Sequence, residues 1–103
     1  MITTTTLKNA AFAIEHDLFT DSLSGANYLV KDGAILRRWE PLADDGDAFR
    51  LAVVLNISIY QSPFGVDCGN HDDCVTFEGW GEDRFSATRR AIVRAASALG
   101  AAL

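Results

Sequence analysis

The 103-residue chain is short of several residue types, and each shortage excludes a class of protein. It contains only two cysteines, which are too few for the disulfide framework of a small secreted domain. No apolar run reaches about 18 residues, and no basic-then-apolar leader opens the chain. We therefore expect a cytoplasmic protein with free thiols, without a transmembrane helix or a secretory signal.

Basic residues are also scarce. Nine Lys and Arg stand against fourteen Asp and Glu, which gives a formal net charge of −5 and an isoelectric point near 4.7. Proteins that bind duplex nucleic acid neutralise many phosphates with basic side chains. The acidic balance disfavours that mode of binding, so we expect no duplex nucleic-acid partner.

Apolar side chains, in contrast, are abundant. They make up 49% of the 103 residues, which is enough for one hydrophobic core in a chain close to the commonest domain size. We expect a single small α+β domain over residues 1–103.

The strongest pattern lies in residues 39–55. Pro41 cannot donate to a strand ladder, so the preceding strand should end there. In the acidic turn that follows, Asp45 or Asp47 is expected to cap a helix that ends near Asn56. The same carboxylates suit a divalent cation. The remaining ligand positions of a calcium loop are missing, however, so capping is favoured.

The remaining segments predict the order helix, hairpin, helix, strand, strand, helix. The expected bounds are a helix over 7–18, hairpin arms 27–31 and 34–39, paired strands 57–60 and 75–78, and a helix from about 82 to Gly100. Helical spacing over 23–30 offers a short helix as an alternative to the first hairpin arm. Val75 and Phe77 are expected to face the core, and Phe85 belongs to the buried stripe of the last helix.

Apolar residues on both faces of the expected sheet indicate a layered architecture. We predict an α/β/α sandwich in which three helices cover a mainly antiparallel sheet of about four strands.

Three motifs within residues 28–99 carry a family resemblance. They read Trp39-x-Pro41-Leu42-x-Asp44-Asp45-Gly46-Asp47-Ala48-x-Arg50-Leu51-Ala52, Asn56-Ile57-Ser58-Ile59 and Ala87-Thr88-Arg89-Arg90-Ala91-Ile92-x-Arg94-Ala95. The chain resembles the phage ABA-sandwich domain, a family of small phage and prophage proteins with an α/β/α layered fold. The resemblance implies a phage or prophage accessory protein, and it implies no particular activity.

One stretch carries residue types that bind metals. Cys68, His71 and Cys74 occur close together, with Asp72 and Asp73 between them. Zinc sites usually use four ligands in pairs such as Cys-x-x-Cys, and a second pair is missing here. A polar hairpin loop is therefore favoured. The alternative is a small metal-dependent enzyme or a metal-binding protein, and we expect no other cofactor.

Two further features are candidates for binding a ligand or a partner. Trp80 stands between two glycines, where it would stack on a ligand or close the core. Arg89, Arg90 and Arg94 form a basic strip on the last helix. The strip would bind an acidic partner or a phosphate group, or form a solvated face paired with nearby acids.

No pattern of a known catalytic site is present, because neither a Ser/His/Asp or Cys/His signature nor a Gly-rich phosphate loop occurs. The sequence indicates a non-enzymatic binding or interaction module with an unidentified protein or small-molecule partner. Expected sheet edges near Ser62-Pro63 and at Tyr28, with an alanine-rich C-terminus, leave a weak homodimer open.

Overall fold

A computed structural model describes residues 2–70 and 75–103, which form three α-helices and two three-stranded antiparallel sheets. The elements are α1 (Thr4–Ala13), β1 (Asp17–Thr20), β2 (Asn27–Lys31), β3 (Ala34–Arg38), α2 (Asp45–Val54), β4 (Ser58–Gln61), β5 (Gly65–Gly69), β6 (Thr76–Gly79) and α3 (Arg84–Ala101). The α+β class and the first hairpin are thus confirmed. None of the described helices is both long and apolar enough to cross a membrane.

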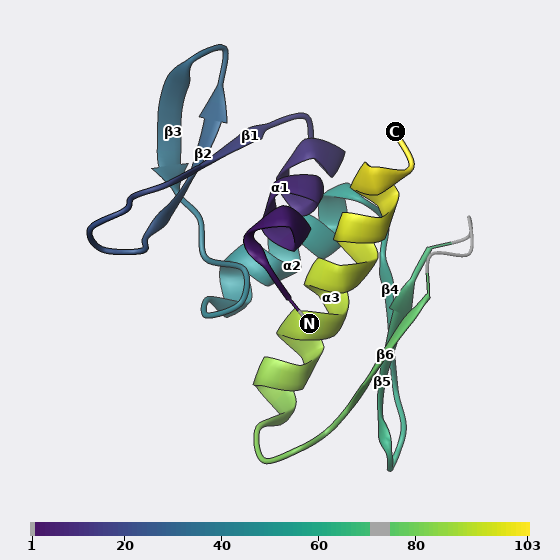
Figure 1. Ribbon diagram of the computed structural model, residues 1–103. Helices are drawn as coiled ribbons and strands as arrows, with labels where there is room; N and C mark the ends of the chain where they lie inside the picture. The colour runs from purple at the N-terminus through teal and green to yellow at the C-terminus, as the bar shows by residue number, and fades with distance from the viewer. Residues whose placement is uncertain (1, 71–74) are drawn as a thin grey trace.

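The strands are divided between two sheets, where one sheet of about four strands was expected. Their orders are β1-β2-β3 and β4-β5-β6. The first sheet projects from the helices, and the second packs along α3 (Figure 1). Since α3 contacts α1 as well as β5 and β6, the layers run sheet, α3, α1. They differ from the expected order of helix, sheet, helix.

The first helix is shorter than expected because a left-handed residue ends it early. Glu15 has a φ of 63°, and the N–H of His16 donates to the carbonyl of Ala11 at 3.0 Å. This is the hydrogen bond of a helix C-terminal cap, in which glycine usually takes the left-handed position. The chain then forms β1, which pairs with β2. Tyr28 therefore lies on a central strand, and its predicted role at a sheet edge is wrong.

Helix α2 begins and ends much as expected. Its N-cap is Asp44, one residue before the first predicted candidate, and the Asp44 carboxylate accepts the N–H of Asp47 at 2.8 Å. The capping role of the acidic turn is thus confirmed on a different aspartate. Asn56 has a φ of 58°, which asparagine tolerates well, and it follows the end of the helix as predicted.

Strand β5 was not expected, yet it is the central strand of its sheet. It lies between β4 and β6, which were expected to pair with each other directly. Glycine and aspartate weaken its strand pattern. Gly65 is required, because a Cβ there would lie 2.3 Å from the carbonyl oxygen of Glu78.

The two faces of β6 are the reverse of those expected. Val75, just before the strand, and Phe77 are 65% and 51% exposed. Thr76 instead faces α3 and donates through Oγ1 to the carbonyl of Ala91 at 2.8 Å. Glu78 faces the arginines of α3. The inner side of this strand is polar because α3 offers polar partners there.

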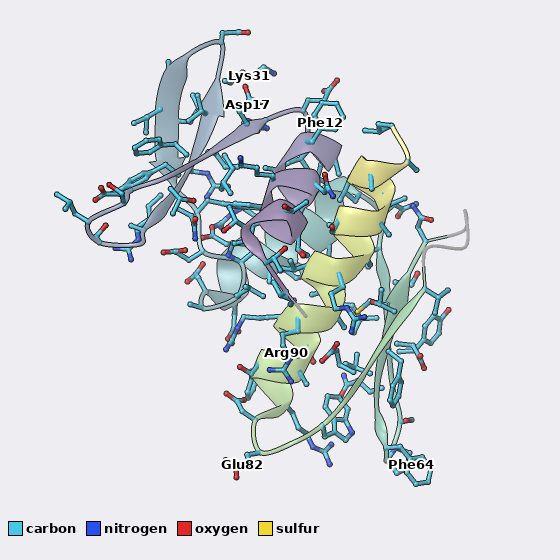
Figure 2. The ribbon with its side chains drawn as sticks, in the orientation of Figure 1. Phe12, Asp17, Lys31, Phe64, Glu82 and Arg90 are labelled. Atoms are coloured by element: carbon cyan, nitrogen blue, oxygen red, sulfur yellow. The ribbon has the colours of Figure 1, made fainter. Side chains whose placement is uncertain are left out.

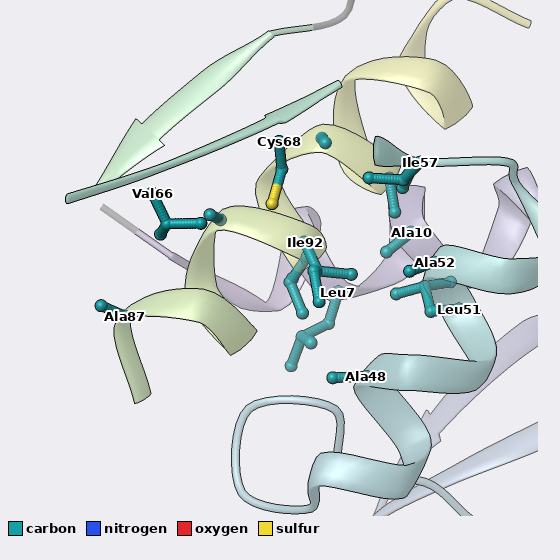
Figure 3. Close-up of a cluster of buried hydrophobic side chains, with 14 of the residues drawn as sticks. Leu7, Ala10, Ala48, Leu51, Ala52, Ile57, Val66, Cys68, Ala87 and Ile92 are labelled. Atoms are coloured by element: carbon teal, nitrogen blue, oxygen red, sulfur yellow. The ribbon is translucent and has the colours of Figure 1, made fainter. Parts of the chain in front are cut away.

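Small residues of α3 form the centre of the core. Its buried residues are Ala87, Ala91, Ile92, Val93, Ala95, Ala96 and Gly100. Figure 3 shows Leu7, Leu51 and Val66 converging on this helix from α1, α2 and β5. Two expectations for α3 are wrong: Phe85 is 70% exposed, and Gly100 lies inside the helix rather than ending it.

We predict that Gly100→Ala destabilises the protein. Alanine normally stabilises a helix relative to glycine by about 1 kcal/mol, but a Cβ at position 100 would lie 1.8 Å from the carbonyl oxygen of Asn9 in α1. We expect a net loss of about 1–3 kcal/mol, as in overpacked cores, measured by urea unfolding. The matched control is Gly46→Ala in α2, where the nearest atom is the capping side-chain oxygen of Asp44 at 3.2 Å rather than a backbone atom of another helix. Equal stability of Gly100→Ala and the parent would contradict close packing of α1 on α3.

Candidate functional site

Cys68, the first residue of the predicted metal site, belongs to the core. Its side chain points from β5 toward α3 (Figure 3) and is fully buried. Burial raises the pKa of the Cys68 thiol to about 11, and the neighbouring Asp67 carboxylate adds to this effect. Metals bind the thiolate, so a buried neutral thiol is a poor ligand.

The other residues of that predicted site, His71, Asp72, Asp73 and Cys74, lie outside the described residues. Within residues 2–70 and 75–103, no group of three or more His, Cys, Asp or Glu is arranged to hold a metal ion. The metal site therefore stays a prediction.

Arg89 joins α3 to the turn before α2. Its Nε donates to the carbonyl of Leu42 at 2.8 Å, and its guanidinium pairs with the carboxylate of Asp45. Only 14% of the Arg89 side chain is exposed. These two contacts tie α3 to the start of α2.

Arg90 and Arg94 both pair with Glu78 of β6, and Figure 2 shows Arg90 on α3. Burial alone would raise the pKa of Glu78, but hydrogen bonds from Arg94 and Arg90, together with their charges, outweigh it and hold that pKa below its usual range. The charge of these two arginines is thus balanced within the chain. They lie toward β6, apart from Arg89.

Trp80 is mostly buried and closes one end of the core. Its indole N–H donates to the carbonyl of Ser62 at 2.7 Å, so it ties the β4–β5 turn to the segment before α3. The guanidinium of Arg84 lies over the indole ring, 4.7 Å from the ring centroid. This stacking is a cation–π contact.

Trp80 and Arg89 line one cleft of about 430 Å³ between α2, β4 and the first half of α3. The other lining residues are Asp45, Ala48 and Phe49 of α2, Ile59 and Gln61 of β4, and Arg84, Phe85, Thr88 and Ile92 of α3. The volume and the mostly apolar lining are typical of ligand sites. The structure thus brings two of the four predicted binding residues together and leaves Arg90 and Arg94 outside.

Large apolar side chains stand uncovered at the rim of this cleft. Phe49 and Phe85 are 64% and 70% exposed, and Ile59 is 38% exposed. A concave apolar floor with exposed aromatic residues beside it is typical of a protein-binding surface. Sequence reasoning missed this role for Phe49 and Phe85. For Phe49 a signal was available, because it lies off the helical stripe of Ala48 and Ala52.

Phe49 also lines a second cleft of about 320 Å³. Leu36, Trp39 and Val53 are among its lining residues, and both Leu36 and Val53 are more than half exposed. Phe49 of α2 is thus shared by two largely apolar clefts.

The charges of the first cleft are unevenly balanced. Asp45 and Arg89 neutralise each other. In the described part of the chain, no acidic side chain lies within ion-pair distance of Arg84. The cleft therefore combines an apolar surface with one uncompensated positive charge.

Asp47 holds the start of α2, and with it Phe49, in place. Its carboxylate accepts the N–H of Glu40 at 2.8 Å and pairs with Arg50 at 2.8 Å and Arg37 at 3.0 Å. Burial alone would raise the pKa of Asp47, but the Glu40 N–H and the two guanidinium groups outweigh it and hold the pKa below its usual range.

Comparison with known proteins identifies no relative: no family model, curated protein or solved structure matches the chain. The resemblance to the phage ABA-sandwich domain therefore stays a prediction, and the case for a function depends on the cleft.

We predict that Asp47→Asn lowers the free energy of unfolding by about 1–3 kcal/mol at pH 7, because charged hydrogen-bonding partners lose their counter-charge. A carboxyl whose folded pKa is depressed stabilises the protein above its unfolded value of about 3.9, and this stability is lost as pH falls through the folded pKa. The difference between variant and parent should therefore shrink below about pH 4. Urea unfolding at neutral and acidic pH measures it.

The control for this prediction is Asp17→Asn, since Asp17 is exposed on β1. We expect its effect to stay within about 0.5 kcal/mol. A loss for Asp47→Asn that is equally large at both pH values would contradict the proposed role of the charge.

We also predict that zinc leaves the melting temperature unchanged. Cys68 would have to leave the core to bind the ion, and a ligand raises stability only if it binds the native state. Elemental analysis after purification without chelator, with thermal unfolding before and after zinc addition, measures this. Stoichiometric metal together with a raised melting temperature would instead favour the metal-binding alternative.

Proposed function

We propose that this protein is a non-enzymatic interaction module, encoded by a phage or prophage and acting in the cytoplasm of a bacterial host. It binds a protein partner in the cleft between α2, β4 and α3. The observation that carries the proposal is the pair of exposed phenylalanines, Phe49 and Phe85, at the rim of an apolar floor.

The polar groups of the cleft support binding rather than catalysis. Thr88 donates its hydroxyl to the carbonyl of Arg84 within α3. Asp45 is paired with Arg89, which also donates to the main chain. These side chains are occupied by structural contacts, and among the described lining residues no hydroxyl or thiol lies beside a free base.

Burial of apolar surface would drive this association. Covering a side chain such as phenylalanine contributes about 1.5–3 kcal/mol, and aromatic residues at the centre of an interface often dominate its affinity. Two phenylalanines alone fall short of the roughly 8 kcal/mol that micromolar binding requires. The partner must therefore also use other groups around the cleft.

We predict that Phe49→Glu and Phe85→Glu each reduce partner recovery at least about tenfold, because each places a charge where apolar surface must be buried. Tagged protein expressed in bacterial host cells is crosslinked, purified and assayed by quantitative mass spectrometry. The matched control is Phe64→Glu, since Phe64 is 81% exposed and lies at the tip of the β4–β5 turn, outside the cleft (Figure 2). Circular dichroism checks that every variant folds.

Two outcomes would contradict the proposal. One is a partner that the parent and both cleft variants recover equally. The other is turnover in a broad hydrolase panel that Phe49→Glu or Phe85→Glu abolishes, because the cleft would then be an active site.

A further inference from the structure

The outer edge of β4 presents unpaired backbone groups. β4 is an end strand of its sheet, and the N–H of Ser62 donates to the carbonyl of Gly65 at 2.9 Å to close the turn to β5. Bonded and non-bonded pairs alternate along an antiparallel ladder. Tyr60 therefore bonds to β5, whereas the N–H and C=O groups of Ile59 and Gln61 point outward.

The side chains of the same two residues line the cleft. Ile59 and Gln61 lie opposite Cys68 and Val66, and opposite residues share a face of the sheet. Outside the β4–β5 ladder, none of the hydrogen bonds among residues 2–70 and 75–103 uses the backbone N–H or C=O of Ile59 or Gln61. The free edge and the apolar cleft thus adjoin along one strand.

The other three edge strands, β1, β3 and β6, carry features that discourage pairing, whereas residues 58–61 of β4 carry none. β1 begins with the exposed charge of Asp17. The register of β3 is irregular opposite Leu29 and Val30, and β6 turns the charge of Glu78 inward. Such irregularities and inward charges protect edges from added strands. Residues 58–61 include neither a charge nor a proline, so this edge is open to a partner.

We infer that an extended segment of the partner adds to β4 as a fourth strand. Its residues that exchange hydrogen bonds with Ile59 and Gln61 would turn their side chains toward the cleft, because directly opposite residues share a face. Strand addition draws affinity from the backbone and specificity from alternate side chains. The inference deepens the proposed function and rests on it, because both place the partner at the cleft.

The chemistry of the cleft defines the segment. Ile59, Phe85 and the indole of Trp80 line the cleft, so the alternate residues of the segment that face them would be apolar. The indole N–H of Trp80 donates a hydrogen bond to the carbonyl of Ser62, directly after β4. The guanidinium of Arg84 lies over the Trp80 ring. An acidic residue at the end of the segment that lies beyond Gln61 would therefore meet the uncompensated charge of Arg84.

A second copy of the chain fits this edge less well. In a pairing of two β4 strands, each cleft would receive Ile59 and Gln61 of the other copy. Residues 58–61 contain no acidic side chain, so Arg84 would stay uncompensated. Charge complementarity favours a different, acidic segment.

The probe is a panel of synthetic peptides of about eight residues, the length of a strand. They carry isoleucine, valine or phenylalanine at alternate positions and either glutamate or lysine at one end. We expect glutamate peptides to bind about tenfold more tightly than lysine peptides, as a charge-assisted contact implies, and Arg84→Glu to reverse the order. Tryptophan fluorescence measures the affinity. Amide exchange should slow at Ile59 and Gln61 when peptide binds.

Gln61→Pro tests the backbone contact directly. It removes an outward N–H, and proline is tolerated at strand edges. We expect about tenfold weaker peptide binding from the lost hydrogen bond and the displaced strand. The control Gln61→Ala keeps the N–H and should change the affinity less than about twofold. If Gln61→Pro fails to fold, the exchange rates of the two amides in the parent protein decide the question.

Several results would overturn strand addition: no peptide of the panel binds, the bound peptide is helical, Gln61→Pro and Gln61→Ala behave alike, or sedimentation shows a dimer that Gln61→Pro dissolves. Partner recovery that Phe85→Glu removes and Gln61→Pro leaves intact would also overturn it, while the proposed function would stand. Recovery unaffected by either substitution would remove both.

Discussion

Close packing against α3 is the constraint on which the rest of the structure depends. The helix contacts α1, α2, β5 and β6, and it does so with alanines and with Gly100, whose Cα lies against the backbone of Asn9. Small side chains let two backbones approach closely, and interiors of this density tolerate little added volume. Phe85, in the first turn of α3, is not among the residues that the helix buries against these neighbours, and it stays at the surface beside the cleft.

Polar contacts help to hold α2 and α3, two of the elements that line the cleft, in place. Asp47 ties the first turn of α2 to Glu40 and Arg37, and Arg89 ties α3 to the same acidic turn. Both sets of contacts are hydrogen bonds to charged groups, which restrict the distance and direction between two groups more than apolar packing does. Arg89 thus adds a polar tie between α3 and the start of α2 to the apolar packing of the two helices, while Asp47 holds the start of α2 to the segment before it. Asp45 and Arg89 neutralise each other in an ion pair, which leaves Arg84 as the cleft charge that a partner could contact.

The sheet β4-β5-β6 combines a face that is packed on α3 with an edge strand that is not paired on its outer side. This combination suits a binding module. Its inner face is held to α3 by Val66, Cys68 and the paired Glu78. Its β4 strand is an edge of the sheet and lies beside the cleft. A partner strand there would gain main-chain hydrogen bonds and apolar burial at once, which compensates for the small size of the domain. The net charge of −5 opposes acidic partners at long range, so the proposed selectivity for an acidic segment would have to come from contact with Arg84 itself.

Local patterns in the sequence determined the α+β class, the hairpin around Asp32-Gly33, the acidic cap of α2 and its end at Asn56. Each depends on the conformational preferences of a few adjacent residues. Tertiary structure alone decided the rest. Glu15 ends α1 in a left-handed conformation that glutamate rarely adopts. β5 is a central strand despite its glycines. β6 turns Glu78 inward because Arg90 and Arg94 of α3 form ion pairs with its carboxylate. The cleft itself joins residues from 45 to 92, and no local pattern carries contacts between segments so far apart, because they depend on how complete elements pack.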